Sequence, residues 1–308
     1  MENINETTAH VVEVVSDMTD IPKGAVNIRE NGKSIFHADS EHVKIVKKTD
    51  QPGIDIIVDA EAKNELVHIP VVVSQPGLSD KVYNDFYIAD GASCYIIAGC
   101  GLHNDSEHIT RHDGIHTFHI GKNASVRYIE KHYGEGTGTG AKILNPVTKV
   151  FMGEGSNLTM DMIQIEGVDS TVRDTFVEMD ADAKMTVTEK LMTHDNQKAE
   201  SNMEIKLNGD GATARIISRS VAKDKSVQIF HPKAIGNAGC HAHVQCDSII
   251  MDDALVSSIP EITASHVDAQ LIHEAAIGRI NNDQLIKLRT FGLNEEEAEA
   301  VIIDNFLK

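Results

Sequence analysis

Short hydrophobic stretches alternate with turns rich in Gly, Asp and Asn along most of the chain. Seven segments share the form of a strand, a turn and a second strand: IADGASCYII, HIGKNASVRYI, FMGEGSNLTM, EMDADAKMTV, KLNGDGATARII, KAIGNAGCHAHV and IIMDDALVSSI. Within these segments hydrophobic and polar residues tend to alternate, as they do from residue 126 to residue 131. A period of two residues is typical of strands and not of solenoid helices.

The turns recur at a nearly constant spacing. A small residue follows successive turns at Ala92, Ala124, Ser156, Ala183, Ala212 and Ala238, and these positions are mostly 26 to 32 residues apart. A repeat of this length indicates a stack of similar structural units. We therefore expect a mainly β protein in which residues 71–265 form the core of a parallel β-helix. An ordinary β-sandwich built from hairpins is the alternative that the pattern leaves open.

The two ends of the chain differ from the repeats. Residues 1–70 contain strand and turn signals and are expected to form an N-terminal strand/turn segment. Residues 266–308 are expected to form a helical segment, with two short helices separated at Gly292. The second helix should begin at Asn294, because Glu297 completes a capping box. Its expected hydrophobic face, which must pack on the solenoid or on a partner, contains Ala298, Val301, Ile302 and Phe306. A cap that covers the open end of the solenoid is the alternative.

Composition narrows the classes of partner and the compartment. The 308 residues are 41% hydrophobic, which is enough for a large core, and they carry a formal net charge of −19. Such acidity argues against binding nucleic acid or an anionic membrane surface. The first residues lack the features of a signal peptide, so we expect a cytoplasmic protein. Its four cysteines should then be reduced thiols and not a disulfide framework.

One segment concentrates thiol and imidazole groups. The run AGCGLHNDSEHITRHDGIHTFHIG contains Cys100 and the histidines His103, His108, His112, His116 and His119. These side chains are suitable metal ligands, although their spacing matches no zinc finger, and a solvated histidine-rich loop is the alternative. Cys100 lies between Gly99 and Gly101, which predicts an accessible thiol.

A second candidate site lies in HAHVQCDSII, residues 241–250. On an unbroken strand Cys240 and Cys246 share one face but are about 20 Å apart at about 3.3 Å per residue, too far to bind one metal ion. His241 and His243 share the opposite face and could bind a metal together, unless they are simply surface histidines. Further on, His273 and Glu274 are adjacent, so both could face one metal only at a bulge or at a strand end.

Several enzyme motifs are absent from the sequence. The glycine-rich run GEGTGTGAK lacks the GK[ST] ending of a phosphate-binding loop, and there is no GxSxG, HExxH or EF-hand motif. Paired carboxylates do not recur at matching positions of the repeats, which argues against a polysaccharide lyase or hydrolase. A structural adaptor in which Cys246 packs in the core is a further alternative.

The last two thirds of the chain resemble a known family. The turn GDGA and the motifs QCDS, HEA and DQL, followed by the closing GL…EEA segment, occur in the order seen in the SufB/SufD family of iron–sulfur cluster assembly scaffolds. The resemblance covers about residues 90–308 and is closer to the SufB branch, in a minimal form. It implies a right-handed parallel β-helix followed by a helical segment that docks on SufC, an ABC-type ATPase.

The resemblance also implies roles for individual residues. Cys246, Glu274 and His273 would be ligands of a transient iron–sulfur cluster, and Cys100 would be a sulfur acceptor. His103, His108, His112, His241 and His243 are weaker metal candidates. The chain would be a non-catalytic scaffold, and a homodimer would replace the SufB–SufD pair. A sulfur donor and cluster acceptor proteins would be its further partners.

Overall fold

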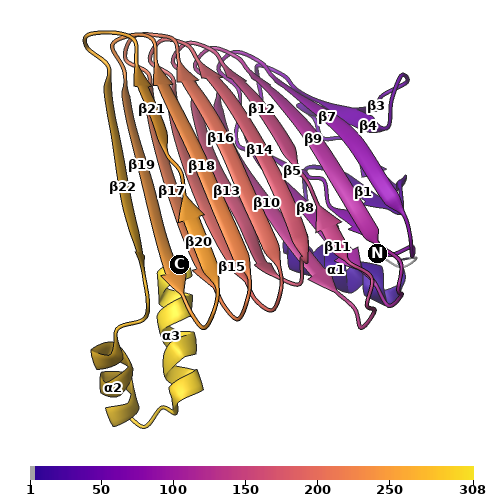
Figure 1. Ribbon diagram of the computed structural model, residues 1–308. Coiled ribbons are helices and arrows are strands. Elements are labelled where there is room, and N and C mark those ends of the chain that lie inside the picture. Colours follow the sequence, from indigo (N-terminus) through magenta and orange to yellow (C-terminus); the bar gives the residue numbers. More distant parts are fainter. Residues whose placement is uncertain (1–3) are drawn as a thin grey trace.

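The chain forms a parallel β-solenoid in which two long sheets face each other, with helices at both ends of the chain (Figure 1). The computed structural model describes residues 4–308. The expected parallel β-helix is therefore confirmed, with about eight turns. None of the helices within the described residues is both long and hydrophobic enough to cross a membrane.

Each turn of the solenoid contributes to both sheets. The first sheet consists of β1 (Ala25–Glu30), β2 (Lys33–Ala38), β5 (Glu65–His68), β6 (Val71–Val73), β8 (Ser93–His103), β10 (Ser125–Glu135), β13 (Asn157–Glu166), β15 (Lys184–Thr193), β17 (Thr213–Ala222), β19 (His241–Ile250) and β22 (Gln270–Gly278). The second sheet consists of β3 (Val43–Lys47), β4 (Gly53–Val58), β7 (Ser79–Ile88), β9 (Thr110–Ile120), β11 (Lys142–Leu144), β12 (Val147–Met152), β14 (Ser170–Met179), β16 (Lys198–Leu207), β18 (Val227–Gly236), β20 (Leu255–Ser258) and β21 (Glu261–Ala264).

The strand register explains the sequence repeat. Ser125 of β10 pairs with Ser93 of β8 and with Asn157 of β13, so equivalent residues here are 32 positions apart. The small residues after the turns are all buried, at no more than 8% exposed, because the chain turns inward at these corners. Successive turns are joined there by backbone hydrogen bonds, such as the one from Ser125 N–H to the carbonyl of Ala92. A larger side chain at these corners would separate the turns.

The N-terminal region differs from the expected strand/turn segment. It begins with helix α1 (Glu6–Ser16), which packs Val11, Val12 and Val15 fully buried against the outer side of the first sheet. β-Branched valines disfavour a helix intrinsically, and packing on the first sheet stabilises them in this one. Strands β4 and β5 already pair in parallel with β7 and β8, and they therefore belong to the solenoid although they begin before residue 71.

The C-terminal region also differs from the expected helical segment, because β22 continues the first sheet beyond residue 265. Helices α2 (Asn282–Thr290) and α3 (Glu295–Leu307) follow, separated at Gly292 with a φ of +97°, and Asn294 and Glu297 form the expected capping box. The buried face of α3 consists of Ala298, Ile303 and Leu307, and α3 lies against β17 and not across the open end of the solenoid. The expected face was therefore wrong for Val301, which is 38% exposed.

Candidate functional site

Cys246 lies on the inner face of β19, near the end of the solenoid at which β22 is the last strand of the first sheet. The strand alternates as expected, with Ala242, Val244 and Cys246 buried, and with His241 exposed on the other face. Cys246 is 3% exposed and pairs in register with Ser218 of β17 and Ala275 of β22. Its thiol therefore faces the interior, one strand away from the open end of the first sheet.

His273 is a possible metal ligand that lies beside this thiol. It lies on the inner face of β22, in register with Val244, and its Nε2 is 3.4 Å from the Cys246 Sγ. Burial raises the pKa of Cys246 to about 11, against a smaller opposing effect of the Ser258 hydroxyl beside it. Burial also lowers the pKa of His273. At neutral pH the pair is therefore a thiol beside a neutral imidazole, which can bind a metal when the metal displaces the thiol proton.

Glu274 points away from this pair. The register of β22 against β19 is continuous without a bulge, so Glu274 lies on the outer face, opposite Gln245. Its Oε2 is 3.3 Å from the Nε2 of His243, within ion-pair distance but not aligned for a hydrogen bond. The three residues expected to act together are thus divided: Cys246 and His273 form an inner pair, and His243 and Glu274 form an outer pair.

Cys100 is not the accessible thiol that its glycine neighbours predicted. It is 4% exposed on the inner face of β8, and burial, reinforced by the charges of Glu130 and Asp80, raises its pKa well above the ordinary value. The flanking glycines serve a different contact. A Cβ on Gly99 would lie 2.7 Å from the carbonyl carbon of Val15, so the glycine allows α1 to approach β8 closely.

The histidine-rich segment does not form one metal site, because strand alternation separates its members. His103 is held by Glu135 and Asp105, each at 2.9 Å from a ring nitrogen, and these carboxylates raise its pKa although burial lowers it. His108 lies exposed in the loop. His119 points outward and stacks between Tyr87 and Phe151, with ring centroids 5.0 and 5.5 Å away. The remaining two histidines, His112 and His116, are buried inside the solenoid.

A buried polar network occupies the interior between Cys100 and Cys246. One inward row of the first sheet runs through Glu130, Met162, Glu189 and Ser218 to Cys246, and the neighbouring row contains Cys100 beside His132. Two hydroxyls donate to Glu189: that of Ser201 at 2.8 Å and that of Ser218 at 3.2 Å. Sequence reasoning missed this network, although polar residues at positions where the alternation points inward were the available signal.

Arg173 and Glu130 form the centre of the network. Arg173 reaches from β14 in the second sheet and donates to the Glu130 carboxylate, and its Nη2 is 3.2 Å from His132. Burial alone would raise the pKa of Glu130, but the charges of Arg173 and His132 outweigh it and hold the pKa well below the ordinary value. A charged pair therefore persists inside the solenoid at neutral pH.

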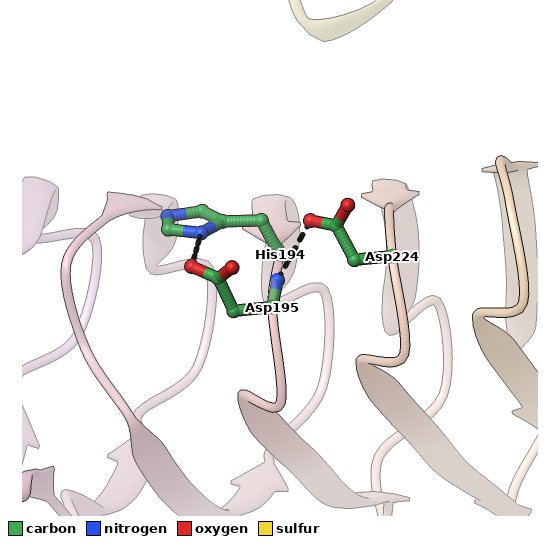
Figure 2. A group of neighbouring side chains, drawn as sticks. All are labelled: His194, Asp195 and Asp224. Atoms are coloured by element: carbon green, nitrogen blue, oxygen red, sulfur yellow. Dashed lines mark hydrogen bonds and ion pairs between the residues drawn. The ribbon is translucent and has the colours of Figure 1, made fainter.

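A third group of possible ligands lies on the surface, at the turns after β15 and β17. Figure 2 shows His194, Asp195 and Asp224, which offer ligand atoms within 4.8 Å of one another. The His194 Nδ1 is 2.7 Å from the Asp195 carboxylate, and the Asp195 N–H donates to Asp224 at 2.8 Å. Both aspartates are exposed, with left-handed backbone at φ of 51° and 58°. The hydrogen bonds account for the arrangement as a repeated turn structure.

Comparison with known proteins gives a consistent result. Residues 173–306 match the family model described as "SUF system FeS cluster assembly, SufBD core domain". A protein of Methanocaldococcus jannaschii described as an iron–sulfur cluster assembly SufBD family protein is 30% identical over 248 residues, which cover 78% of this chain and 76% of the relative. A protein of Archaeoglobus fulgidus with the same family description is 27% identical over 275 residues, covering 88% of this chain and 70% of the relative.

Proposed function

The chain belongs to the SufBD family of iron–sulfur cluster assembly proteins, and from this premise we propose that it is a scaffold on which a nascent cluster forms and from which the cluster is transferred. The observation that carries the proposal is the inner pair, in which the Cys246 Sγ lies 3.4 Å from the His273 Nε2 at the open end of the solenoid. The cluster is the cargo of this site and not a resident cofactor.

The chemistry of the inner pair suits temporary binding of iron. A thiolate and an imidazole are both good iron ligands, but two protein ligands leave coordination positions free for sulfide and for groups from another chain. Because burial keeps the thiol protonated at neutral pH, each binding event releases a proton and each departure takes one up. A cluster bound in this way is held less firmly than one with four thiolate ligands, which favours transfer to an acceptor protein.

We propose that a second copy of the chain completes the site. Strand β22 is the terminal strand of the first sheet, so its outer edge can pair with another strand. Large hydrophobic side chains are exposed at the same end: Leu255, Ile259, Ile262, Val267, Ile272 and Ile277, from 41% to 95% exposed. Association through this end would bring two inner pairs together, and it would cover a hydrophobic surface that a monomer leaves in water.

The C-terminal helices offer a separate surface for an ATPase partner. Helix α2 buries none of its residues, and a groove of about 640 Å³ lies between it and α3. Phe291, at the edge of this groove, is 76% exposed. We propose that a SufC-like ABC ATPase docks here and supplies the work of conformational change, since the sequence contains no phosphate-binding loop of its own. The scaffold itself would then be non-catalytic.

Cys100 would attack the outer sulfur of a persulfide on a donor protein, so that the donor leaves as a thiol and Cys100 becomes the persulfide. Release of this sulfur as sulfide for the inner pair would take two electrons from a separate thiol or protein reductant. The neighbour of Cys100, His132, begins the buried network that continues through Arg173 and Glu189 to Ser218, next to Cys246. Because both thiols are buried, sulfur delivery requires a local opening of the solenoid near Cys100. This part of the proposal predicts that Cys100→Ala lowers sulfur uptake without removing the iron ligands.

The ligand assignment is tested by anaerobic reconstitution with iron and sulfide, followed by absorbance and by counting bound iron. Cys246→Ala and His273→Ala should take up little or no cluster. The control is Cys240→Ala, which removes a buried thiol directly before β19 and should take up the same cluster as the wild type. Glu274→Gln should also retain the cluster, because Glu274 faces outward. If Cys246→Ala takes up the same cluster as the wild type, or if the wild type takes up none, the proposal is wrong.

The ATPase surface is tested separately with a chain shortened after Arg279, which removes α2 and α3. The truncated chain should keep its β-rich circular dichroism spectrum but lose binding to the SufC-like ATPase. A substitution of the exposed Phe291 by Ser should weaken binding without affecting the fold, because its side chain contributes little to the core. Undiminished binding of both variants would place the ATPase on another surface.

A further inference from the structure

The interior of the second sheet contains two histidines that face each other across a glycine. Strand β9 directs His112, Gly114 and His116 inward in succession, with the two histidines only 1% and 3% exposed. A Cβ placed on Gly114 would lie 3.3 Å from the His116 Nε2 and 3.5 Å from the His112 Nε2, and the next nearest atom is also in the His116 ring. Both Nε2 atoms therefore border the space that the missing side chain leaves.

The hydrogen bonds of His112 fix its tautomer. Its Nδ1 lies 3.1 Å from the Asp80 Oδ2, and a carboxylate accepts, so this nitrogen carries the hydrogen. Asp80 is ionised because hydrogen bonds from His112 and Arg29 hold its pKa low against the effect of burial. In the neutral ring the Nε2 of His112 then carries the lone pair, and this atom is buried without a hydrogen-bond partner among the described residues. A histidine whose other nitrogen donates to a carboxylate is the usual form of a metal ligand.

His116 is oriented in the same way. Its Nδ1 lies 2.7 Å from the Tyr128 hydroxyl, which donates its own hydrogen to Glu130 at 3.1 Å and so accepts from the ring. The Nε2 of His116 is then the acceptor, and it accepts a hydrogen bond from the Asn84 amide at 3.4 Å that a bound metal would replace. Burial lowers the pKa of His116 to about 4, so the ring is neutral at physiological pH.

We propose that His112 and His116 bind one divalent transition-metal ion in the space beside Gly114. The two Nε2 atoms are at most about 7 Å apart, since they lie 3.3 and 3.5 Å from the same point. A metal about 2.1 Å from each nitrogen requires them to be within about 4 Å, which a tilt of each ring by about 1.5 Å provides. Water or sulfide would fill the remaining coordination positions.

The charges around the two histidines determine whether the metal ion must enter together with an anion. Asp80 is paired with Arg29, and Glu130 with Arg173, so the carboxylates behind the two rings are already balanced. A divalent ion would therefore enter together with hydroxide or sulfide, which lowers the net charge that is buried. The identity of the ion as Fe²⁺, waiting inside the scaffold for cluster assembly, rests on the proposed function, but the presence of a metal site does not.

The test is a titration of the full chain with Co²⁺ in the absence of sulfide, followed by visible absorbance and by metal counting after dialysis. The decisive variant is Gly114→Ala, which keeps both histidines but places a methyl group where the metal would bind. The wild type should bind one equivalent of Co²⁺ more than Gly114→Ala. Gly114 has no left-handed backbone, so alanine is compatible with the strand. His112→Asn, whose amide can keep the bond to Asp80, provides the same comparison if Gly114→Ala does not fold.

Two control variants separate this site from the others. His119→Ala removes a histidine from the outer face of the same strand, and His194→Ala removes the ligand at the surface turn. Both should retain the inner equivalent of Co²⁺. Equal binding by the wild type and Gly114→Ala, or loss of all bound metal in His194→Ala, would overturn the proposal. Cys246→Ala should keep this Co²⁺ equivalent, so a failure of cluster reconstitution and a failure of this site are distinguished.

Discussion

The buried ion pair between Glu130 and Arg173 gives a quantitative prediction about the solenoid interior. Their side chains are 1% and 4% exposed, and they join the first sheet to the second. Replacing Arg173 with Met leaves the Glu130 carboxylate buried without its main counter-charge. Removing one partner of a buried pair costs about 3–5 kcal/mol. Because Glu130 keeps its contacts with His132 and Tyr128, we expect a loss near the lower end, about 3 kcal/mol.

The double variant Glu130→Gln with Arg173→Met removes both charges. It should therefore be less destabilised than Arg173→Met alone, by about 1–2 kcal/mol, because no unpaired charge remains in the core. Urea unfolding of the wild type, both single variants and the double variant at pH 7 gives the coupling energy between the two residues. If the two single effects add to the double effect within about 0.5 kcal/mol, the pair does not interact as the structure indicates.

The Glu130–Arg173 pair also predicts how the free energy of unfolding depends on pH. In the wild type the pKa of Glu130 is held well below its ordinary value of 4.5, so its contribution to stability is present above pH 4.5 and is lost as the pH falls further. In Arg173→Met burial is no longer offset by the arginine, so the Glu130 pKa should rise. The free energy of unfolding of this variant is lower than that of the wild type at pH 7, and this difference should therefore shrink as the pH is lowered toward 4.5. A difference that is constant over this range would contradict the assignment.

Three further predictions concern other parts of the molecule. Gly99→Ala should detach α1 and speed hydrogen exchange in residues 6–16, whereas Gly278→Ala, where a Cβ meets nothing within 4 Å, should have no such effect. Alkylation of Cys246 should be about 100-fold slower than that of an ordinary cysteine between pH 7 and 9 and should rise up to about pH 11, measured by peptide mass against the denatured chain. Asn294→Ala should destabilise α3 by about 1 kcal/mol, seen as faster exchange of its amides alone.

The interior contains charged side chains as well as hydrophobic ones. Burying Glu130, Arg173 and Glu189 costs desolvation energy, and hydrophobic side chains of similar volume would often stabilise the core as well or better. The cost falls in the rows that contain or adjoin Cys100 and Cys246. The buried charges therefore lie beside the two thiols, as expected if the interior is used for chemistry. The reconstitution experiment tests this at Cys246, and the Co²⁺ experiment tests it at His112 and His116.

Much of the fold was determined by the sequence itself. A repeat of 26 to 32 residues with a small residue after each turn favours stacked parallel strands, because each turn must bury its hydrophobic positions against the next, and the family resemblance favoured this fold over a β-sandwich. The alternation also placed Cys246 inward and His241 outward correctly. The capping box of α3 was readable because all its atoms come from four consecutive residues. Helix α1 was missed, because packing on β8 and not intrinsic propensity stabilises its valines.

Only the tertiary structure decided which side chains meet. Cys246 and His273 are 27 residues apart, and their contact depends on the register between β19 and β22. The same register sends Glu274 to His243 on the other face, a result that adjacency in the sequence could not reveal. His112 and His116 converge because the residue between them has no side chain and because Asp80 and Tyr128 orient their rings from other strands. Alternation gives the direction of a side chain, whereas its partner depends on the strand that packs beside it.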